Sequence, residues 1–378
     1  MGSAAAYQLS KRGVNVLGID QFNPPHVKGS THGETRITRL AMGEGVAYTP
    51  IAIRSHEIWR ELEALTGKSL LTITGSLIIT PTKLQNSLHG KSDFLEQTLL
   101  SAEKYGIAHE LFRGKEITRR FPQFLVSDDE VAFFEHDAGF VRPELCVQVQ
   151  LDLARSNGAD IHTDEKVMTF TPQGDGVLVV TEAGEYFAEH LIVSAGPWIS
   201  DFLNPEYRPL VNVYRQVLYW FSVHNAAHFA PSEFPVFIWD LGGGDDMYGF
   251  PAIDGADGGI KIATEKYIDP TTPDSVVRTV SEEETMEMFE KRIHNRLIGV
   301  QDICLKAATC LYSVTPDDSF IIDFLPDFPQ VIIASPCSGH GFKHSAGVGE
   351  ILADLATKGH SALDISPFGF NRFDPTRK

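Results

Sequence analysis

The opening of the chain, MGSAAAYQLSKRGVNVLGID, constrains the fold more than any other stretch. The alanines at 4–6 and Leu9 favour a helix, and Gly13 comes after two basic residues as a helix stop signal. The short apolar run at 14–19 indicates a strand and ends in Asp20. The order helix, glycine, strand, acid is typical of the segment directly after the glycine-rich turn of a dinucleotide-binding βαβ unit.

This opening holds only part of the usual fingerprint. If Gly2 is the third glycine of a GxGxxG turn, Asp20 lies where an acid accepts a hydrogen bond from a ribose hydroxyl. Taken alone, the segment fits an ordinary amphipathic helix and a strand after it equally well.

Length and charge limit the possible partners. The chain has 378 residues, enough for a large core and two domains, and 43% of them are hydrophobic. A formal net charge of -18 argues against nucleic acid and anionic membranes as partners. Any site for an anion must therefore gather its cations locally.

The cysteines and the N-terminus indicate the compartment. Cys146, Cys304, Cys310 and Cys337 show neither CxxC pairing nor the spacing of zinc ligands, so we expect no metal site and no disulfide framework. Lys11 and Arg12 fall where a secretory signal would be apolar, and no stretch is long and apolar enough to span a bilayer. We expect a cytoplasmic protein.

Helical and extended patterns alternate along the rest of the chain. Helices are expected over 51–65, 85–105 and 143–156 and in EEETMEMFEKRI. Strands are expected in LLTITGSLIITPT with a bend at Gly75, in VAFFEHDAGFV, several times between 160 and 193, and as a buried run in LIVSAGPW. The stretch from 214 to 268 alternates aromatic and β-branched residues with glycine-rich turns, as antiparallel sheets do. FIIDFLP, VIIASPCSGHGF and SAGVGEILADLA predict strand, strand, glycine-rich turn and helix.

Together these patterns predict an α/β chain (α+β in its two-domain form). A Rossmann-like nucleotide-binding domain, without the first strand of its pattern in this sequence, comes from segments 1–74, 137–206 and 302–378. An antiparallel-sheet substrate domain is inserted twice, as segments 75–136 and 207–301.

Two stretches go beyond generic folding signals: GSTHGETRITRLAMGEG (29–45) and SGHGFKHSAGVGE (338–350). With YGFP (248–251), Lys261 and ATCLY (308–312), they resemble the monomeric sarcosine oxidase and N-methyltryptophan oxidase family. The five motifs agree in order and approximate spacing over essentially the whole chain. The resemblance implies an FAD-dependent, monomeric enzyme that oxidises an N-methyl amino acid with O2, releasing H2O2 after the imine hydrolyses.

The chain departs from the family at its start. Family members begin with a strand and a full GxGxxG turn, of which this sequence has only Gly2. We expect an upstream segment to supply that strand, and weak FAD binding by the chain without it.

The resemblance implies a covalent cofactor. The position of Cys310 carries a thioether to the 8α-methyl group of the flavin in the family, although a cysteine between Thr309 and Leu311 is by itself more typical of an inert core. Glycines in the SGHGFK turn would let the backbone approach the flavin. The implied cofactor-binding residues are Cys310, Gly2, Asp20, Ser30, Arg36, Val167, Gly196, Gly339, Gly341, Phe342 and Lys343.

The resemblance also assigns the reacting groups. Arg39 and Lys343 match the pair that binds the substrate carboxylate, and the position of Arg36 lies near the flavin; a solvated charge run is the alternative for the arginines. Lys261 matches a lysine that activates O2, because a fixed cation stabilises the developing superoxide, whereas a strand lysine is ordinarily solvent-facing. Tyr248 and Tyr312 match tyrosines of the amine pocket.

The substrate pocket differs from the family pattern. Glu265 stands where the family usually has histidine, and Ile238, with Trp239 after it, stands where sarcosine oxidases often have methionine. A carboxylate at 265 either repels an amino-acid carboxylate or recruits a second amino group. The implied catalytic set is Lys261, Arg36, Arg39, Lys343, Tyr248, Tyr312 and Glu265.

Two alternatives remain open on the sequence alone. One is a dehydrogenase of the same fold that passes electrons to a quinone or protein. The other is an inactive flavin-binding protein, since most of the glycine cradle for the pyrophosphate is missing from this sequence.

Overall fold

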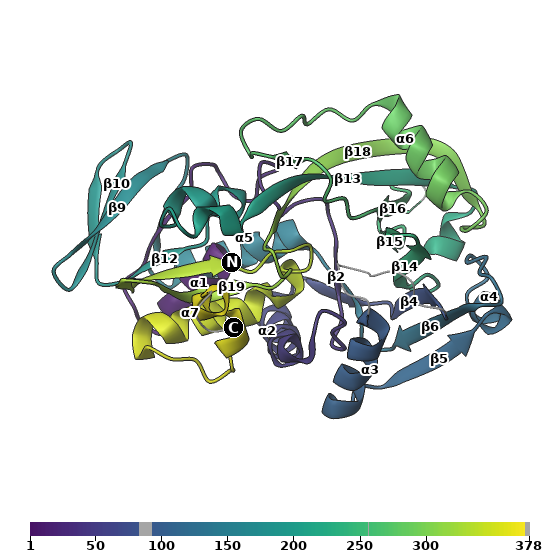
Figure 1. Cartoon of the computed structure of the whole chain (residues 1–378), viewed down its shortest axis with the longest axis horizontal. Helices are drawn as coiled ribbons and strands as arrows, with labels where there is room; N and C mark the ends of the chain where they lie inside the picture. Colours follow the sequence, from purple (N-terminus) through teal and green to yellow (C-terminus); the bar gives the residue numbers. More distant parts are fainter. Residues whose placement is uncertain (83–92, 256, 375–378) are drawn as a thin grey trace.

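The computed structural model describes residues 1–82, 93–255 and 257–374. Figure 1 shows two parts side by side, one built around helices α1, α5 and α7 and the other around a long curved sheet that includes β13 and β18. The helices are α1 (Gly2–Lys11), α2 (Thr49–Thr66), α3 (Phe94–Tyr105), α4 (Lys115–Arg120), α5 (Pro143–Ser156), α6 (Glu282–Met288) and α7 (Ser345–Lys358). The predicted helices are confirmed, except that the part of the 85–105 helix before residue 93 lies outside the described residues.

The opening of the chain folds as predicted. After α1, strand β1 (Leu17–Ile19) pairs in parallel with β8 (Asp160–His162). Only three residues of the apolar run form the strand. Val14 and Leu17 are 37% and 39% exposed, because within the described chain β1 is paired with a neighbouring strand on one edge only.

A second small sheet holds the strands near the C-terminus. It has the order β12 (Leu191–Val193), β20 (Phe328–Ser335), β19 (Ile321–Leu325), with β12 and β20 parallel. The expectation of a fully buried strand in LIVSAGPW is wrong for Leu191 and Ile192, which are half-buried. The reason is that β12, like β1, is paired on one edge only among the residues described. Helix α1 packs against α5 and α7 beside these strands, as in a Rossmann-like layer.

The second part is a nine-stranded sheet in the order β17, β13, β16, β15, β14, β4, β6, β5, with β18 also paired to β13. All its pairs are antiparallel except β4 with β14, which confirms the antiparallel prediction for 214–268. Its strands are β4 (Ser76–Pro81), β5 (His109–Arg113), β6 (Glu130–Glu135), β13 (Asn212–Val223), β14 (Val236–Gly242), β15 (Asp245–Phe250), β16 (Ile260–Ala263), β17 (Pro270–Thr271) and β18 (Val300–Val314). Both predicted inserted segments contribute to this sheet; the domain boundaries themselves stay a prediction.

Alternation along the strands gives this sheet two different faces. Trp239, Met247, Ile260 and Ile262 point into the largest apolar cluster. Their neighbours along the same strands point to the opposite face, which lies toward the first part of the molecule. Two three-stranded sheets complete the fold: β2 (Arg36–Thr38), β7 (Gly139–Val141), β3 (Leu71–Ile73), and β9 (Val167–Gln173), β10 (Gly176–Thr181), β11 (Glu185–Ala188).

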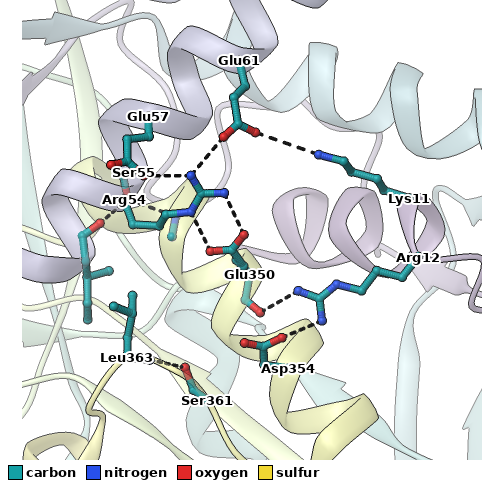
Figure 2. Close-up of polar contacts among 12 residues, drawn as sticks. Lys11, Arg12, Arg54, Ser55, Glu57, Glu61, Glu350, Asp354, Ser361 and Leu363 are labelled. Atoms are coloured by element: carbon teal, nitrogen blue, oxygen red, sulfur yellow. Dashed lines mark hydrogen bonds and ion pairs between the residues drawn. The ribbon is translucent and has the colours of Figure 1, made fainter.

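Salt bridges at the surface connect the helices of the first part. Figure 2 shows Arg54 of α2 bonded to Glu350 of α7 at 2.8 and 2.9 Å, and also to Glu57 and Glu61. Arg12, directly after α1, forms a separate ion pair with Asp354 of α7. Partly exposed pairs of this kind contribute little each, so the buried contact between α1 and α7 matters more.

That buried contact depends on Gly349. A Cβ atom at this position would lie 2.6 Å from the backbone carbon of Ala4 and 2.9 Å from its carbonyl oxygen. Gly349→Ala is expected to lower the stability by about 1–3 kcal/mol, because the clash with backbone outweighs the roughly 1 kcal/mol gain in helix propensity. Thermal unfolding measures this, with Gly184→Ala as the control, since a Cβ atom there meets nothing within 4 Å. Equal melting temperatures for the two variants would contradict the packing argument.

Three further observations bear on function. The four cysteines are free thiols. Within the described ranges, no group of three or more histidine, cysteine, aspartate or glutamate side chains is placed to hold a metal ion. In the same ranges, no helix has the length and apolar character needed to cross a bilayer.

Candidate active site

A cavity that opens to solvent, with about 580 Å³ of empty space including this opening, lies against the second face of the nine-stranded sheet. It is lined by eight of the predicted catalytic or cofactor-binding residues: Arg36, Arg39, Tyr248, Glu265, Tyr312, Gly339, Phe342 and Lys343. The other lining residues are Ile37, Glu44, Ile238, Asp246, Phe250 and His340. The sequence motifs from the start, middle and end of the chain therefore meet in one place.

Strand register decides which side chains reach the cavity. Phe250 lies opposite Lys261, and Tyr248 lies opposite both Ala263 and Ile238. These residues alternate with the core residues of β14, β15 and β16, so they face the cavity side.

Lys261 is buried at one end of this face, with only 2% of its surface exposed. Its Nζ donates hydrogen bonds to the carbonyl oxygens of Gly33 at 2.8 Å and Thr35 at 2.6 Å, and lies 3.8 Å from the centre of the Phe250 ring. Burial, helped by the nearby Arg36, holds the lysine pKa well below its usual value. The solvent-facing alternative for this lysine is wrong.

Cys310 on β18 is fully buried beside the loop that precedes β2. Its Sγ lies 3.4 Å from Arg36 Nη2 and 3.5 Å from the Ser30 carbonyl oxygen. Arg36 also donates to that carbonyl at 2.8 Å. Three residues predicted to contact the cofactor thus lie together, and a solvated charge run is excluded for Arg36.

Arg39 and Lys343 both form ion pairs with the carboxylate of Glu44. Arg39 Nη2 donates to Glu44 Oε2 at 2.8 Å, and Lys343 Nζ donates to Glu44 Oε1 at 3.2 Å. All three are buried, and burial lowers the pKa of Lys343 to about 8 although Glu44 opposes the shift. Arg39 Nε has no hydrogen-bond partner, so this cluster retains an unused donor.

The backbone after Arg39 is held by a buried carboxyl group. Glu135 accepts hydrogen bonds from the backbone N–H groups of Leu40 at 2.6 Å and Ala41 at 3.0 Å. Burial raises the pKa of Glu135 to about 7, more than these two donors lower it. Glu135 therefore holds the backbone directly after Arg39, just beyond the end of β2.

The two predicted tyrosines form a pair at the middle of the cavity. The hydroxyl oxygens of Tyr248 and Tyr312 lie 3.0 Å apart. Burial raises the pKa of both phenols, so both stay neutral hydrogen-bonding groups at physiological pH. Glu265 lies further along, accepting a hydrogen bond from the Tyr267 hydroxyl at 2.7 Å.

The turn before α7 approaches this cavity through glycines. Gly339 has φ +79°, and a Cβ atom there would lie 2.7 Å from Glu265 Oε1 and 3.0 Å from the Tyr312 ring. A Cβ atom at Gly341 would overlap the carbonyl group of Pro336. Phe342 and Lys343 come next, in the 3-10 turn Phe342–His344. Both glycines are therefore required by the close approach of other protein atoms, and the contact of this backbone with a ligand stays a prediction.

The remaining predicted residues gather at the N-terminal end of α1. A Cβ atom at Gly2 would lie 2.9 Å from Ser194 Oγ, two residues before Gly196, which has φ +54°. The carbonyl oxygen of Asp20 accepts the N–H of Glu165, two residues before Val167. This second group is separate from the residues that line the cavity.

Two separate groups of residues suit a cofactor with two ends. A flavin dinucleotide has an adenosine end for the α1 group, where Asp20 comes directly after a parallel strand, and a ring system for the cavity. Among the lining residues, Arg39 has an unused donor. Behind the lining, the buried thiol of Cys310 lies beside Arg36, and the buried His32 has an unpartnered Nε2. The residues present therefore fit a flavin.

Sequence reasoning missed Glu44, Asp246 and Glu135. Glu44 sits in the GEG end of the first motif, and Asp246 lies two residues before Tyr248, so strand alternation alone could have found Asp246. Glu135 has no local signal, because its partners lie 94 and 95 residues away in the chain.

Comparison with known proteins identifies the family of the chain. A family model described as FAD dependent oxidoreductase matches residues 1–355. The chain is 41% identical to a monomeric sarcosine oxidase of Streptomyces avermitilis, covering 100% of this chain and 95% of that protein. It is 35% identical to an N-methyl-L-tryptophan oxidase of Escherichia coli, covering 99% and 96% of the two chains.

Solved structures show the same fold at lower identity. NikD, an unusual amino acid oxidase essential for nikkomycin biosynthesis, superposes with a TM-score of 0.80 at 22% identity, over 97% of this chain and 94% of that one. A glycine oxidase from Geobacillus kaustophilus superposes with a TM-score of 0.74 at 17% identity, over 97% and 95%. The α/β fold with a Rossmann-like FAD-binding part is thereby confirmed, and the chain belongs to the family of FAD-dependent oxidoreductases.

Proposed function

We propose that this protein is a flavin-dependent amine oxidase that acts on a secondary, N-methyl amino acid and passes the electrons to O2. The observation that carries the proposal is the buried pair of Arg39 and Lys343, which shares a cavity with Tyr248 and Tyr312. Two other lining residues connect this cavity to the remaining groups, because Arg36 contacts Cys310 and Phe250 contacts Lys261. A carboxylate, an amine and an oxygen molecule each have a matching group there.

The site for the substrate carboxylate is inferred from the charges of three buried residues. Arg39 and Lys343 carry two positive charges and Glu44 one negative charge, so the cluster has one positive charge left for a substrate carboxylate. The unpartnered Nε of Arg39 supplies a directed donor to that carboxylate.

The site for the substrate amine is inferred from the neutral side chains of two tyrosines. Tyr248 and Tyr312 can orient an uncharged amine by hydrogen bonds without protonating it. FAD, when bound, accepts the hydride equivalents from the carbon attached to nitrogen, and the resulting imine hydrolyses in water. Lys261 then lies beside the place where O2 is reduced to H2O2, where its charge stabilises the developing anion.

Cys310 would tether the flavin through a thioether, and Arg36 and the Ser30 carbonyl would hold that thiol in place. The cofactor and catalytic roles of all these residues are part of this proposal. Monomeric state and cytoplasmic location stay predictions of the sequence.

The test begins with the full-length protein and its colour. A panel of N-methyl amino acids mixed anaerobically with the yellow protein should bleach the flavin, and admitting air should restore the colour and produce one H2O2 per substrate. Bleaching without rapid peroxide formation would support the dehydrogenase alternative. A colourless preparation, or a yellow one that no amine bleaches, would support the inactive alternative.

The pKa of Lys343 gives this proposal a pH signature. The lysine is charged below about pH 8 and loses its charge as the pH rises through that value, so carboxylate binding is full below pH 8 and weakens above it. We expect the Kd of an amine-free carboxylate such as propionate to rise about tenfold between pH 7 and 9. Flavin difference spectra measure it, and Lys343→Arg should move the change beyond the accessible range. An identical pH profile in that variant would contradict the assignment.

A further inference from the structure

We propose that the end of the cavity farthest from Lys261 recognises a second positive charge, so that the preferred substrate is an N-methyl amino acid with a basic side chain. The proposal rests on the proposed function, which assigns the other end of the cavity to the substrate carboxylate. It adds Asp246 to Glu265 as the residues that select the side chain.

The cavity face of the sheet is arranged in rows. Lys261 and Phe250 form the first row, and Ala263, Tyr248 and Ile238 form the second. Two residues further along the chain, about 7 Å away by the rise of a strand, come Asp246 on β15 and Glu265 just past the end of β16. This face thus runs from the buried Lys261, beside the cavity, through the aromatic lining residues to two carboxylates.

The acidic row extends beyond the cavity. Asp240 on β14 lies directly opposite Asp246 on β15, and it is buried, with 4% of its surface exposed. Like charges directly opposite one another on antiparallel strands are unfavourable for folding.

Glu265 is fixed where it faces the cavity. Its backbone N–H donates to Asp246 Oδ1 at 3.0 Å, and its Oε2 accepts from the Tyr267 hydroxyl at 2.7 Å. Its other oxygen lies against Gly339, where a Cβ atom would approach it to 2.7 Å. These contacts orient the carboxylate.

Charged residues of both signs line the cavity. Arg39, Lys343 and Glu44 leave one positive charge at the carboxylate end, and Arg36 is bonded to Ser30 and Cys310 beyond it. Asp246 and Glu265 line the same cavity.

An independent sign of a ligand is the Nε of Arg39, which lacks a partner although the residue is only 1% exposed. A ligand with a carboxylate at one end and a cation at the other complements both ends. A ligand with a second carboxylate is repelled.

The experiment compares two substrates of equal length with the full-length protein. N-methyl-lysine and N-methyl-norleucine, each methylated on the α-amino group, differ in the ammonium at the end of the side chain. We expect kcat/KM to favour the lysine derivative by about 10- to 100-fold at low salt. Glu265→Gln and Asp246→Asn, made separately, should each reduce this ratio by about tenfold, with flavin content as the check on folding.

A charge reversal gives a readout that a purely structural role would not move. Glu265→Lys should shift the preference from N-methyl-lysine toward N-methyl-glutamate. Glu283→Gln, an exposed acid on α6, is the matched control and should leave the ratio unchanged.

The outcomes separate the two proposals. If wild type oxidises N-methyl-norleucine as well as N-methyl-lysine, or if both acid variants keep the wild-type ratio, the inference about the side chain is overturned while the proposed function stands. If no N-methyl amino acid of any charge reduces the flavin, the proposed function itself fails.

Discussion

Lys261→Met is expected to slow reoxidation of the reduced flavin by O2 by about 100-fold or more, while reduction of the flavin by substrate changes much less. The reason is that the buried ammonium stabilises negative charge that appears only when O2 accepts an electron. Methionine keeps a similar length beside Phe250 but carries no charge. Stopped-flow absorbance measures the two half-reactions separately.

The chain offers a matched control for this substitution. Lys306 also lies over the Trp220 ring, at 4.4 Å compared with 5.9 Å for Lys261, but its side chain is 51% exposed and pairs with Glu34. Lys306→Met should leave reoxidation within a few-fold of wild type because solvent screens an exposed charge. If both half-reactions slow equally in Lys261→Met, the lysine has a structural role and the oxygen assignment is wrong.

Cys310→Ser is expected to abolish covalent attachment of the flavin. In wild type, acid precipitation should leave the yellow colour in the pellet, because the thioether survives denaturation. In the variant the flavin should move entirely to the supernatant, since a serine hydroxyl is a far weaker nucleophile than a thiol held beside Arg36.

Cys304 on the same strand is the appropriate control. It is half-buried, and its thiol bonds to the Lys306 carbonyl at the far end of β18. Cys304→Ser should keep the colour in the pellet. Colour retained in the Cys310→Ser pellet would place the attachment elsewhere, and colour lost from the wild-type pellet would mean that the flavin is held without a covalent bond.

The fold was largely accessible from the sequence because its elements carry strong local patterns. The helix at 143–156 has proline at its start, and the alternation between 214 and 268 predicts the antiparallel strands. The strands at the edges were less predictable. Exposure of Val14 and of Leu191 depends on whether a neighbouring strand lies on the second edge, and no local pattern encodes that.

How far the sequence could predict the site differs from residue to residue. Period-two alternation separated Lys261 from Ile260 and Ile262, but it could not decide which face is buried, because that depends on Phe250 and on the loop at 33–35. The ion pair of Arg39 with Glu44 spans five residues, whereas the second partner, Lys343, lies 299 residues from Glu44. Contacts over such separations are set by the tertiary fold.

The distance in sequence between Cys310 and its neighbours Ser30 and Arg36, 280 and 274 positions, has a consequence for biosynthesis. The thiol meets the groups around it only after β18 has left the ribosome and joined β13 in the finished sheet. A nascent or prematurely terminated chain cannot assemble this environment, so permanent yellow colour in a cell extract would count only molecules that had matured completely. The amount of covalently bound flavin would therefore measure how many molecules had folded completely.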